Sequence, residues 1–215
     1  MIAIDGFAAS GKGTLGRALA QHLGFAFLDT GAIYRLAALK AIEQGITDHD
    51  PGRAARIARD LKKNFILSET LSPLIRTTQV GQMSSRLSAL PDVRSELLDL
   101  QRNFAKNPPN LETGDPARGA VLDGRDIGTV VCPDADLKFF ITASPEIRAQ
   151  RRFKELQNRG FTDTYDAVLA EMRERDARDA GRAIAQTKPA KDAIVLDTSA
   201  LKEGEVLELA ISHLP

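Results

Sequence analysis

A glycine-rich segment near the N-terminus constrains the fold of this chain more than any other feature of the sequence. It follows the short apolar run Ile2–Ile4 and precedes a helical pattern whose apolar face extends to Leu23, where Gly24 ends it. The segment consists of Gly6, Phe7, Ala8, Ala9, Ser10, Gly11, Lys12, Gly13 and Thr14. A strand, a glycine-rich loop and a helix in this order predict a phosphate-binding loop, or P-loop.

The chemistry of such a loop explains its composition. Glycines let backbone N–H groups converge on a polyphosphate, and the helix N-terminus adds partial positive charge. We expect Lys12 to reach the β- and γ-phosphates and the Thr14 hydroxyl to bind Mg²⁺, because Gly13 takes the usual place of that hydroxyl. The sequence thus predicts a purine nucleoside triphosphate site. The alternative is an ordinary turn with Lys12 as a solvated surface charge.

Short apolar runs alternate with longer helical patterns along the chain. The expected strands are residues 2–4, 25–28, 120–122, 137–141 and 193–196. Strands separated by helices predict an α/β fold of three layers, in which a five-stranded parallel sheet is flanked by helices. Residues 47–119 are read as inserted helical cover with one weak strand candidate, Asn64–Leu67. The length of 215 residues suits one core with inserted subdomains.

Composition narrows the class of protein. Lys and Arg together number 29, as do Asp and Glu, so the net charge of zero argues against a nucleic-acid partner held by bulk charge. The single cysteine, Cys132, fits a reducing compartment, and the three histidines lack metal-ligand spacing. No apolar run suits a membrane span and no signal peptide is visible, so we expect a soluble, cytoplasmic protein.

Two clusters follow expected strands. In the first, Thr30 offers a hydroxyl at a helix start and Arg35 can bind an oxyanion, although Asp29 or Thr30 could be only a helix cap and Arg35 a surface residue. The second comprises Asp123, Gly124, Arg125 and Asp126. Here the Asp123 carboxylate could order Mg²⁺-bound water, and Arg125 suits an acceptor phosphate. The Asp126 carboxylate could accept a hydrogen bond from an exocyclic amine of a base. A polar turn with mutually paired charges is the alternative.

A third cluster lies on a helix late in the chain. Helical spacing places Arg175, Arg178, Asp179 and Arg182 on one face. This face could be a salt-bridge ladder, or part of a lid that closes arginines over a transferring phosphoryl group, to which Arg148, Arg151 and Arg152 could add. Nucleic-acid binding is disfavoured because acidic residues are interleaved and aromatic platforms are lacking.

Taken together, these motifs resemble those of bacterial-type cytidylate kinases from end to end. The matching runs are the P-loop, Asp29–Arg35, Ile75–Thr77, Pro91–Arg94, Asp123–Thr129 and Arg175–Arg182. The resemblance implies a monomeric kinase that transfers the γ-phosphoryl group of ATP to CMP or dCMP with Mg²⁺. It also implies a core of residues 1–46, 119–147 and 186–215, a nucleoside-monophosphate-binding insertion over 47–118, and a lid with flanking helices over 148–185.

The resemblance carries roles to matching residues. It assigns Thr30, Arg35 and Arg125 to the acceptor phosphate, and Ser85, Arg94 and Asp126 to the cytosine edge. Arg175 and Asp179 would contact the ribose, with Arg182 near Thr30 and the nucleotide. Catalysis is assigned to Lys12, Arg125, Arg175 and Arg178. The chain departs from the family in a short segment, Asn64–Ile75, and in extra residues, Glu112–Gly119.

Two other functions stay open from the sequence. A kinase acting on another small acceptor, such as UMP, AMP or shikimate, would share the P-loop. Ser85, Arg94 and Asp126 discriminate here, because an amine-accepting carboxylate suits cytosine, whereas uracil has no exocyclic amine. A P-loop switch or nucleotide-sensing module would bind nucleotide without turnover. A guanine-reading Asn-Lys-x-Asp run, expected of a GTPase, does not occur in the chain.

Overall fold

The computed structural model describes residues 1–66, 68, 70, 73–181 and 186–214. Its contacts divide the chain into two compact units. The first comprises Met1–Phe27 and Pro109–Pro215, and the second comprises Leu28–Pro108. Each unit has its own packing and is described by itself.

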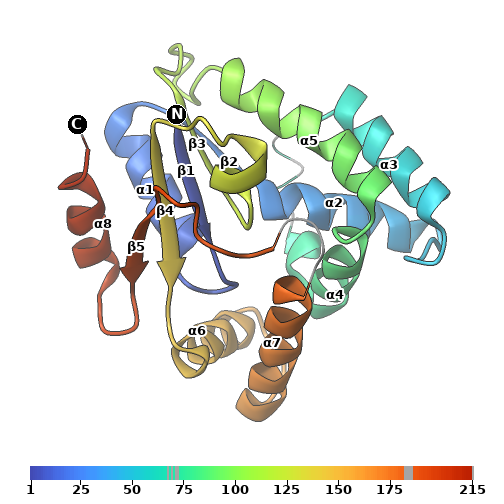
Figure 1. Ribbon diagram of the computed structural model, residues 1–215. Coiled ribbons are helices and arrows are strands. Elements are labelled where there is room, and N and C mark those ends of the chain that lie inside the picture. Colours follow the sequence, from blue (N-terminus) through green and yellow to red (C-terminus); the bar gives the residue numbers. More distant parts are fainter. Residues whose placement is uncertain (67, 69, 71–72, 182–185, 215) are drawn as a thin grey trace. The chain divides into compact units, whose positions relative to one another are not determined.

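One parallel five-stranded sheet organises the first unit (Figure 1). Its strands are β1 (Ile2–Gly6), β2 (Ala26–Asp29), β3 (Ala120–Gly124), β4 (Leu137–Thr142) and β5 (Ile194–Asp197), in the spatial order β2-β3-β1-β4-β5. These are the five expected strands with slightly shifted ends, so the predicted fold class is confirmed. Because β1 lies between β3 and β4, with Asp5 opposite both Gly124 and Phe140, the segments after β1 and β3 emerge side by side.

Helices α1 (Lys12–Leu23) and α8 (Glu203–Ile211) pack on this sheet. Helices α6 (Pro145–Asn158) and α7 (Tyr165–Ala180) follow β4 and lie beyond its end (Figure 1). A π-helical turn, η3 (Ile127–Val131), was not predicted. The expected end of α1 is confirmed, because Gly24 takes the left-handed conformation at φ 65° and caps the carbonyls of the last turn. Helices α6 and α7 pack on each other through Ala149, Leu156, Val168 and Met172.

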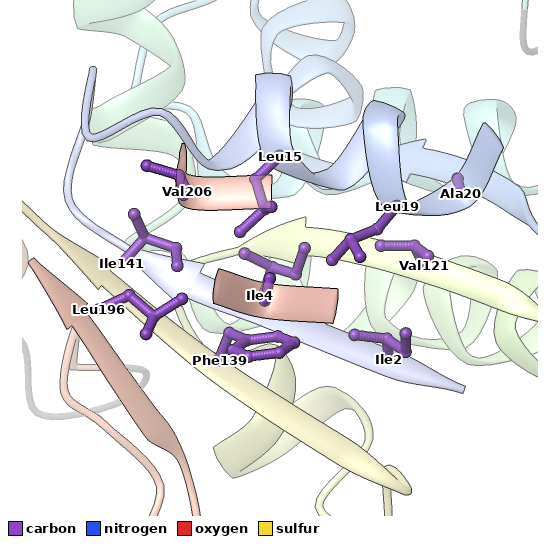
Figure 2. Close-up of a cluster of buried hydrophobic side chains, with 11 residues drawn as sticks. Ile2, Ile4, Leu15, Leu19, Ala20, Val121, Phe139, Ile141, Leu196 and Val206 are labelled. Carbon is purple, nitrogen blue, oxygen red and sulfur yellow. The ribbon is translucent and has the colours of Figure 1, made fainter. Parts of the chain in front are cut away.

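The main core of the first unit lies between the sheet and the pair α1 and α8. Figure 2 shows Ile2 and Ile4 of β1 beneath Leu15 and Leu19 of α1, with Phe139 of β4 on the same face. Alternation along β1 therefore turns Ile2 and Ile4 toward this core and sends Asp5 to the opposite face. The strand carries core and site residues on its two faces.

The second unit begins with the last two residues of β2, and its described regular elements from Thr30 onward are helical. It contains α2 (Thr30–Glu43), α3 (Pro51–Lys63), η2 (Pro73–Arg76), α4 (Thr78–Leu87) and α5 (Pro91–Lys106). Helix α3 packs on α5, where Arg59 pairs with Glu96 at 2.8 Å, and α2 packs on α4. The expectation of helical cover is confirmed here. Residues 64–66 form no strand, and Leu67 lies outside the described residues.

Within the described residues, no helix is long and apolar enough to cross a membrane. The division into a core, an insertion over 47–118 and a lid over 148–185 stays a prediction.

Replacing Phe139 by alanine tests the core. The side chain is 1% exposed, so Phe139→Ala should lower the free energy of unfolding by about 3–5 kcal/mol in urea titrations. Val195→Ala on the neighbouring strand β5 is the matched control, because Val195 is 55% exposed and its loss should cost under about 0.5 kcal/mol. Equal losses for the two variants would contradict this packing.

Candidate active site

The P-loop curls around the amino group of Lys12. Gly6 and Gly11 have φ angles of 145° and 98°, and a Cβ on Gly6 would lie 2.0 Å from the Ile141 carbonyl oxygen. The Lys12 Nζ donates to the Phe7 carbonyl at 2.7 Å, and the side chain is buried. Backbone conformations that favour glycine and a buried cation thus create the concave, positive loop that a polyphosphate requires.

Side chains from α6 and the segment after β5 hold this loop. Arg148 donates to the carbonyls of Ala143 at 2.9 Å and Ala8 at 3.4 Å. The Arg151 guanidinium and the Thr198 hydroxyl both donate to the Ser10 carbonyl, at 3.4 Å and 2.9 Å. Arg148 also pairs with Asp176 at 2.6 Å, and Arg151 also donates to the Thr198 hydroxyl at 2.8 Å. A contribution of these arginines to phosphate stabilisation stays a prediction.

Asp123 reaches the P-loop from the neighbouring strand β3. A Cβ on Gly13 would lie 3.4 Å from the Asp123 Oδ2, so this carboxylate faces the start of α1 between Lys12 and Thr14. Mg²⁺ is commonly held by one or two carboxylates together with substrate phosphates, and it prefers oxygen ligands. The Asp123 carboxylate and the Thr14 hydroxyl beside a phosphate loop therefore fit a nucleotide-bound Mg²⁺.

Beside the P-loop, two arginines share one buried carboxylate. Arg125, directly after β3, and Arg175, on α7, approach the Asp179 Oδ2 with their Nε atoms at 3.5 Å and 4.0 Å. Asp179 is 5% exposed in its side chain, and the arginines are 21% and 19% exposed. The fold thus brings Arg125 to two other predicted site residues, Arg175 and Asp179, which lie one turn apart on α7.

This cluster has more positive than negative charge. Burial lowers the pKa of Arg175 to about 10, the Arg125 guanidinium lowers it further, and the carboxylates of Asp179 and Glu171 oppose the shift. Arg152 adds to the lowering, and Arg175 stays charged at neutral pH, so three arginines here face the two carboxylates of Asp179 and Glu171. An anion supplied by a ligand would relieve this imbalance.

The remaining predicted residues of α7 are arranged differently. Arg178 makes an ion pair with Glu174 one turn earlier, and its side chain is 28% exposed. Arg182 lies outside the described residues. A role for Arg178 and Arg182 in catalysis or binding stays a prediction.

In the second unit, the start of α2 is fixed by an ion pair. The Asp29 Oδ1 accepts from the Ala32 N–H at 2.9 Å and caps the helix, while Oδ2 pairs with Arg76 at 2.8 Å. Thr30, the first helical residue, is buried. Sequence reasoning included Arg76 in a family motif but gave it no role, because a partner 47 positions away carries no local signal.

The other predicted residues of this unit lie on three helices. Arg35 of α2 donates to the Ile75 carbonyl at 3.1 Å, and its guanidinium would lie 3.1 Å from a Cβ on Gly81 of α4. Arg94 of α5 donates to the Ser88 carbonyl at 3.4 Å and lies 6.0 Å from the Tyr34 ring centroid. Ser85 is buried in α4. The predicted acceptor residues are therefore divided between the two units.

Asp5 is a site residue that sequence reasoning missed. Its carboxylate accepts from the backbone N–H groups of Ile127 at 2.7 Å and Gly128 at 2.8 Å, directly after Asp126. Burial raises the pKa of Asp5 to about 6, the two N–H groups oppose this shift, the Asp126 charge adds to it, and Lys12 opposes it. Its contacts are more than a hundred positions away, so only the three-dimensional structure reveals them.

Comparisons with known proteins identify the family of this chain. The family model described as cytidylate kinase matches residues 2–215. Curated cytidylate kinases include one from Paramagnetospirillum magneticum, 50% identical over 98% of this chain and 95% of its own length. Another, from Rhodospirillum rubrum, is 51% identical over 100% of this chain and 96% of its own length. The motifs quoted above thus belong to a similarity that extends over the whole chain.

Among solved structures, an uncharacterized protein from Eubacterium ventriosum superposes with a TM-score of 0.53. The alignment covers 99% of this chain and 96% of that chain at 13% sequence identity. At this identity the match supports the fold alone.

Titration of Asp5 should be visible in stability. Because its pKa rises from 3.8 in the unfolded chain to about 6, its contribution is fully present below pH 3.8 and is lost as pH rises to about 6. Relative to Asp5→Asn, which does not titrate, the wild-type free energy of unfolding should fall by up to about 3 kcal/mol over this range. Urea titrations from pH 4 to 7 measure it. A constant difference between the two proteins would contradict the raised pKa.

Proposed function

The chain belongs to the cytidylate kinase family, and we propose that it transfers the γ-phosphoryl group of ATP to CMP or dCMP. The products are ADP and CDP or dCDP, so the reaction serves pyrimidine nucleotide metabolism. The observation that carries this proposal is the excess positive charge of Arg125 and Arg175 around the buried Asp179. Arg125 of this cluster directly follows β3, and β3 pairs with β1, the strand that leads into the P-loop.

The donor nucleotide would bind to the P-loop. Its backbone N–H groups and Lys12 would hold the β- and γ-phosphates, and residues 6–14 as a whole would form the cradle. Thr14 would hold Mg²⁺ directly, and Asp123 would do so through water. The metal, when bound, neutralises phosphate charge and orients the polyphosphate. Its fit rests on the carboxylate that faces the start of α1.

In this proposal, different residues would recognise different parts of CMP. Thr30, Arg35 and Arg125 would hold the phosphate, and Arg175 and Asp179 the ribose, with Arg182 nearby. The Asp126 carboxylate would accept from the exocyclic amine of cytosine, next to Ser85 and Arg94. If the Asp179 carboxylate accepts from the 3′-hydroxyl of the ribose, the 2′-hydroxyl is dispensable. This accounts for both CMP and dCMP as acceptors.

The transfer requires no nucleophile from the protein. An oxygen of the CMP phosphate attacks the γ-phosphorus in line, the bond to the ADP oxygen breaks, and ADP leaves. At pH 7 the acceptor phosphate is already largely dianionic, because its second pKa is about 6, so no general base is needed. Lys12, Arg125, Arg175 and Arg178 would neutralise charge as the phosphoryl group moves. Exclusion of water from the closed site would prevent hydrolysis of ATP.

The cellular setting follows from the same proposal. A kinase of free nucleotides acts on small molecules and requires neither a nucleic acid nor a membrane as partner. The cytoplasmic location and the monomeric state stay predictions.

Removing either arginine of the cluster should impair turnover more than stability. Arg125→Ala and Arg175→Ala should each lower kcat/KM for CMP by about a hundredfold or more, because charge on the phosphates loses its partner. Arg173→Ala is the matched control, since Arg173 lies on the same helix, is 60% exposed and pairs with Glu146. Coupled ADP-release assays and thermal unfolding measure both quantities. Wild-type turnover in either cluster variant would contradict the assigned role.

A panel of acceptors tests the substrate. With ATP and Mg²⁺, CMP and dCMP should each support rapid ADP release, whereas UMP, AMP, GMP and a reaction without acceptor should not. Uracil has no exocyclic amine for Asp126 to accept from, so UMP should be the informative comparison. Equal rates with UMP would remove this role of Asp126. Nucleotide binding without acceptor-dependent turnover would instead favour a nucleotide-sensing module.

A further inference from the structure

The turn that carries Arg125 and Asp126 is capped by a residue from another strand. The π-helical turn η3 begins at Ile127, and the side chain of Asp126, at its N-cap position, makes no capping hydrogen bond. The first N–H groups of such a turn have no partner within it. Both Oδ atoms of Asp5 accept from these groups instead, at 2.7 Å and 2.8 Å.

The topology explains why β1 supplies this cap. Strands β3 and β4 lie on either side of β1, so the connection between them crosses β1. Asp5 is the residue of β1 that faces away from the main core at the point where η3 crosses. The crossing is close, since a Cβ on Gly128 would lie 3.4 Å from the Asp5 Oδ2 and 3.1 Å from the Lys138 Cδ.

The Asp5 carboxylate thereby connects the proposed donor site with the proposed acceptor site. Asp5 is covalently adjacent to Gly6, the first residue of the P-loop, and is hydrogen-bonded to the residues after Asp126. Moving the turn would move the Arg125 and Asp126 backbone relative to the P-loop. At 3% exposure, this carboxylate is desolvated, and a buried carboxylate is held in place only where hydrogen bonds compensate it.

We propose that Asp5 is a positioning residue for the acceptor, which caps η3 so that Arg125 and Asp126 are presented to CMP in fixed register with the P-loop. This inference rests on the proposed function. It assigns Asp5 no contact with substrate. Loss of the cap should therefore weaken the acceptor side of the reaction and leave ATP binding intact.

The first test compares Michaelis constants. Asn at position 5 has nearly the same shape but accepts through only one oxygen, so Asp5→Asn should raise KM for CMP about tenfold while KM for ATP stays within about twofold. Asp134→Asn is the matched control, because it removes an exposed carboxylate from the same β3–β4 connection. Equal rises in both constants, or no change in either, would overturn the proposal.

Charge state provides a second readout. The groups facing Asp5 are Asp126 of the turn and Lys12 of α1, and the Lys138 stem of β4 packs on Gly128. As the Asp5 carboxylate is protonated below about pH 6, the KM of the wild type for CMP should approach that of Asp5→Asn. The ratio of the two KM values for CMP should thus be largest near pH 8 and shrink toward pH 5.5. The ratio cancels the titration of the CMP phosphate, and a ratio independent of pH would count against Asp5.

Amide hydrogen exchange tests the cap without requiring activity. In Asp5→Asn, peptides covering residues 125–132 should exchange faster than in the wild type, and peptides of α1 should not. In Gly128→Ala, the added methyl group would lie 3.4 Å from the Asp5 Oδ2. This variant should give a smaller increase in exchange, and it replaces Asp5→Asn in the test if Asp5→Asn does not fold. Faster exchange with an unchanged KM would reduce Asp5 to a structural cap. A wild type without CMP-dependent turnover would contradict the proposed function, while the exchange result would still decide whether Asp5 holds the turn.

Discussion

The carboxylate of Asp179 organises the charge of the candidate site. It is nearly inaccessible to solvent, and it is approached by Arg125 from the end of β3 and by Arg175 from its own helix. A buried carboxylate alone would be costly, and two buried arginines alone would be costlier, so each group holds the others in place. The surplus of one positive charge is what makes the cluster suited to an anion. Phosphoryl transfer needs such prearranged charge more than it needs a reactive side chain.

A second constraint comes from the parallel sheet. The C-terminal ends of β1 and β3 lie next to each other, and the two segments that follow them are the P-loop and the Arg125–Asp126 turn. The sheet therefore brings the proposed donor and acceptor residues of the first unit to one edge before any side chain is considered. Around this edge, Arg148, Arg151 and Thr198 hold the P-loop backbone, and Asp5 holds the turn. Of these residues, Thr198 and Asp5 were not identified from the sequence, yet they help to fix the position of residues that were.

Local sequence signals were sufficient for the framework, whereas the roles of the predicted site residues stay predictions. Short apolar runs marked all five strands. Gly24 marked the end of α1, because a helix often ends at a residue in the left-handed conformation and glycine adopts it at low cost. The π-helical turn at 127–131 could not be predicted, since its cap comes from Asp5 on another strand. The contacts of Arg148 and Arg151 with P-loop carbonyls are equally distant in the sequence, so the sequence alone could not reveal them.

The central claim is that the surplus charge of the cluster binds the phosphate of the acceptor. Calorimetric titration with CMP and with cytidine, in the presence of a non-hydrolysable ATP analogue and Mg²⁺, isolates the contribution of that phosphate. The account predicts that the wild type binds CMP at least about a hundredfold more tightly than cytidine, and that Arg125→Ala loses most of this ratio while cytidine affinity changes little. A ratio that Arg125→Ala leaves unchanged would contradict it.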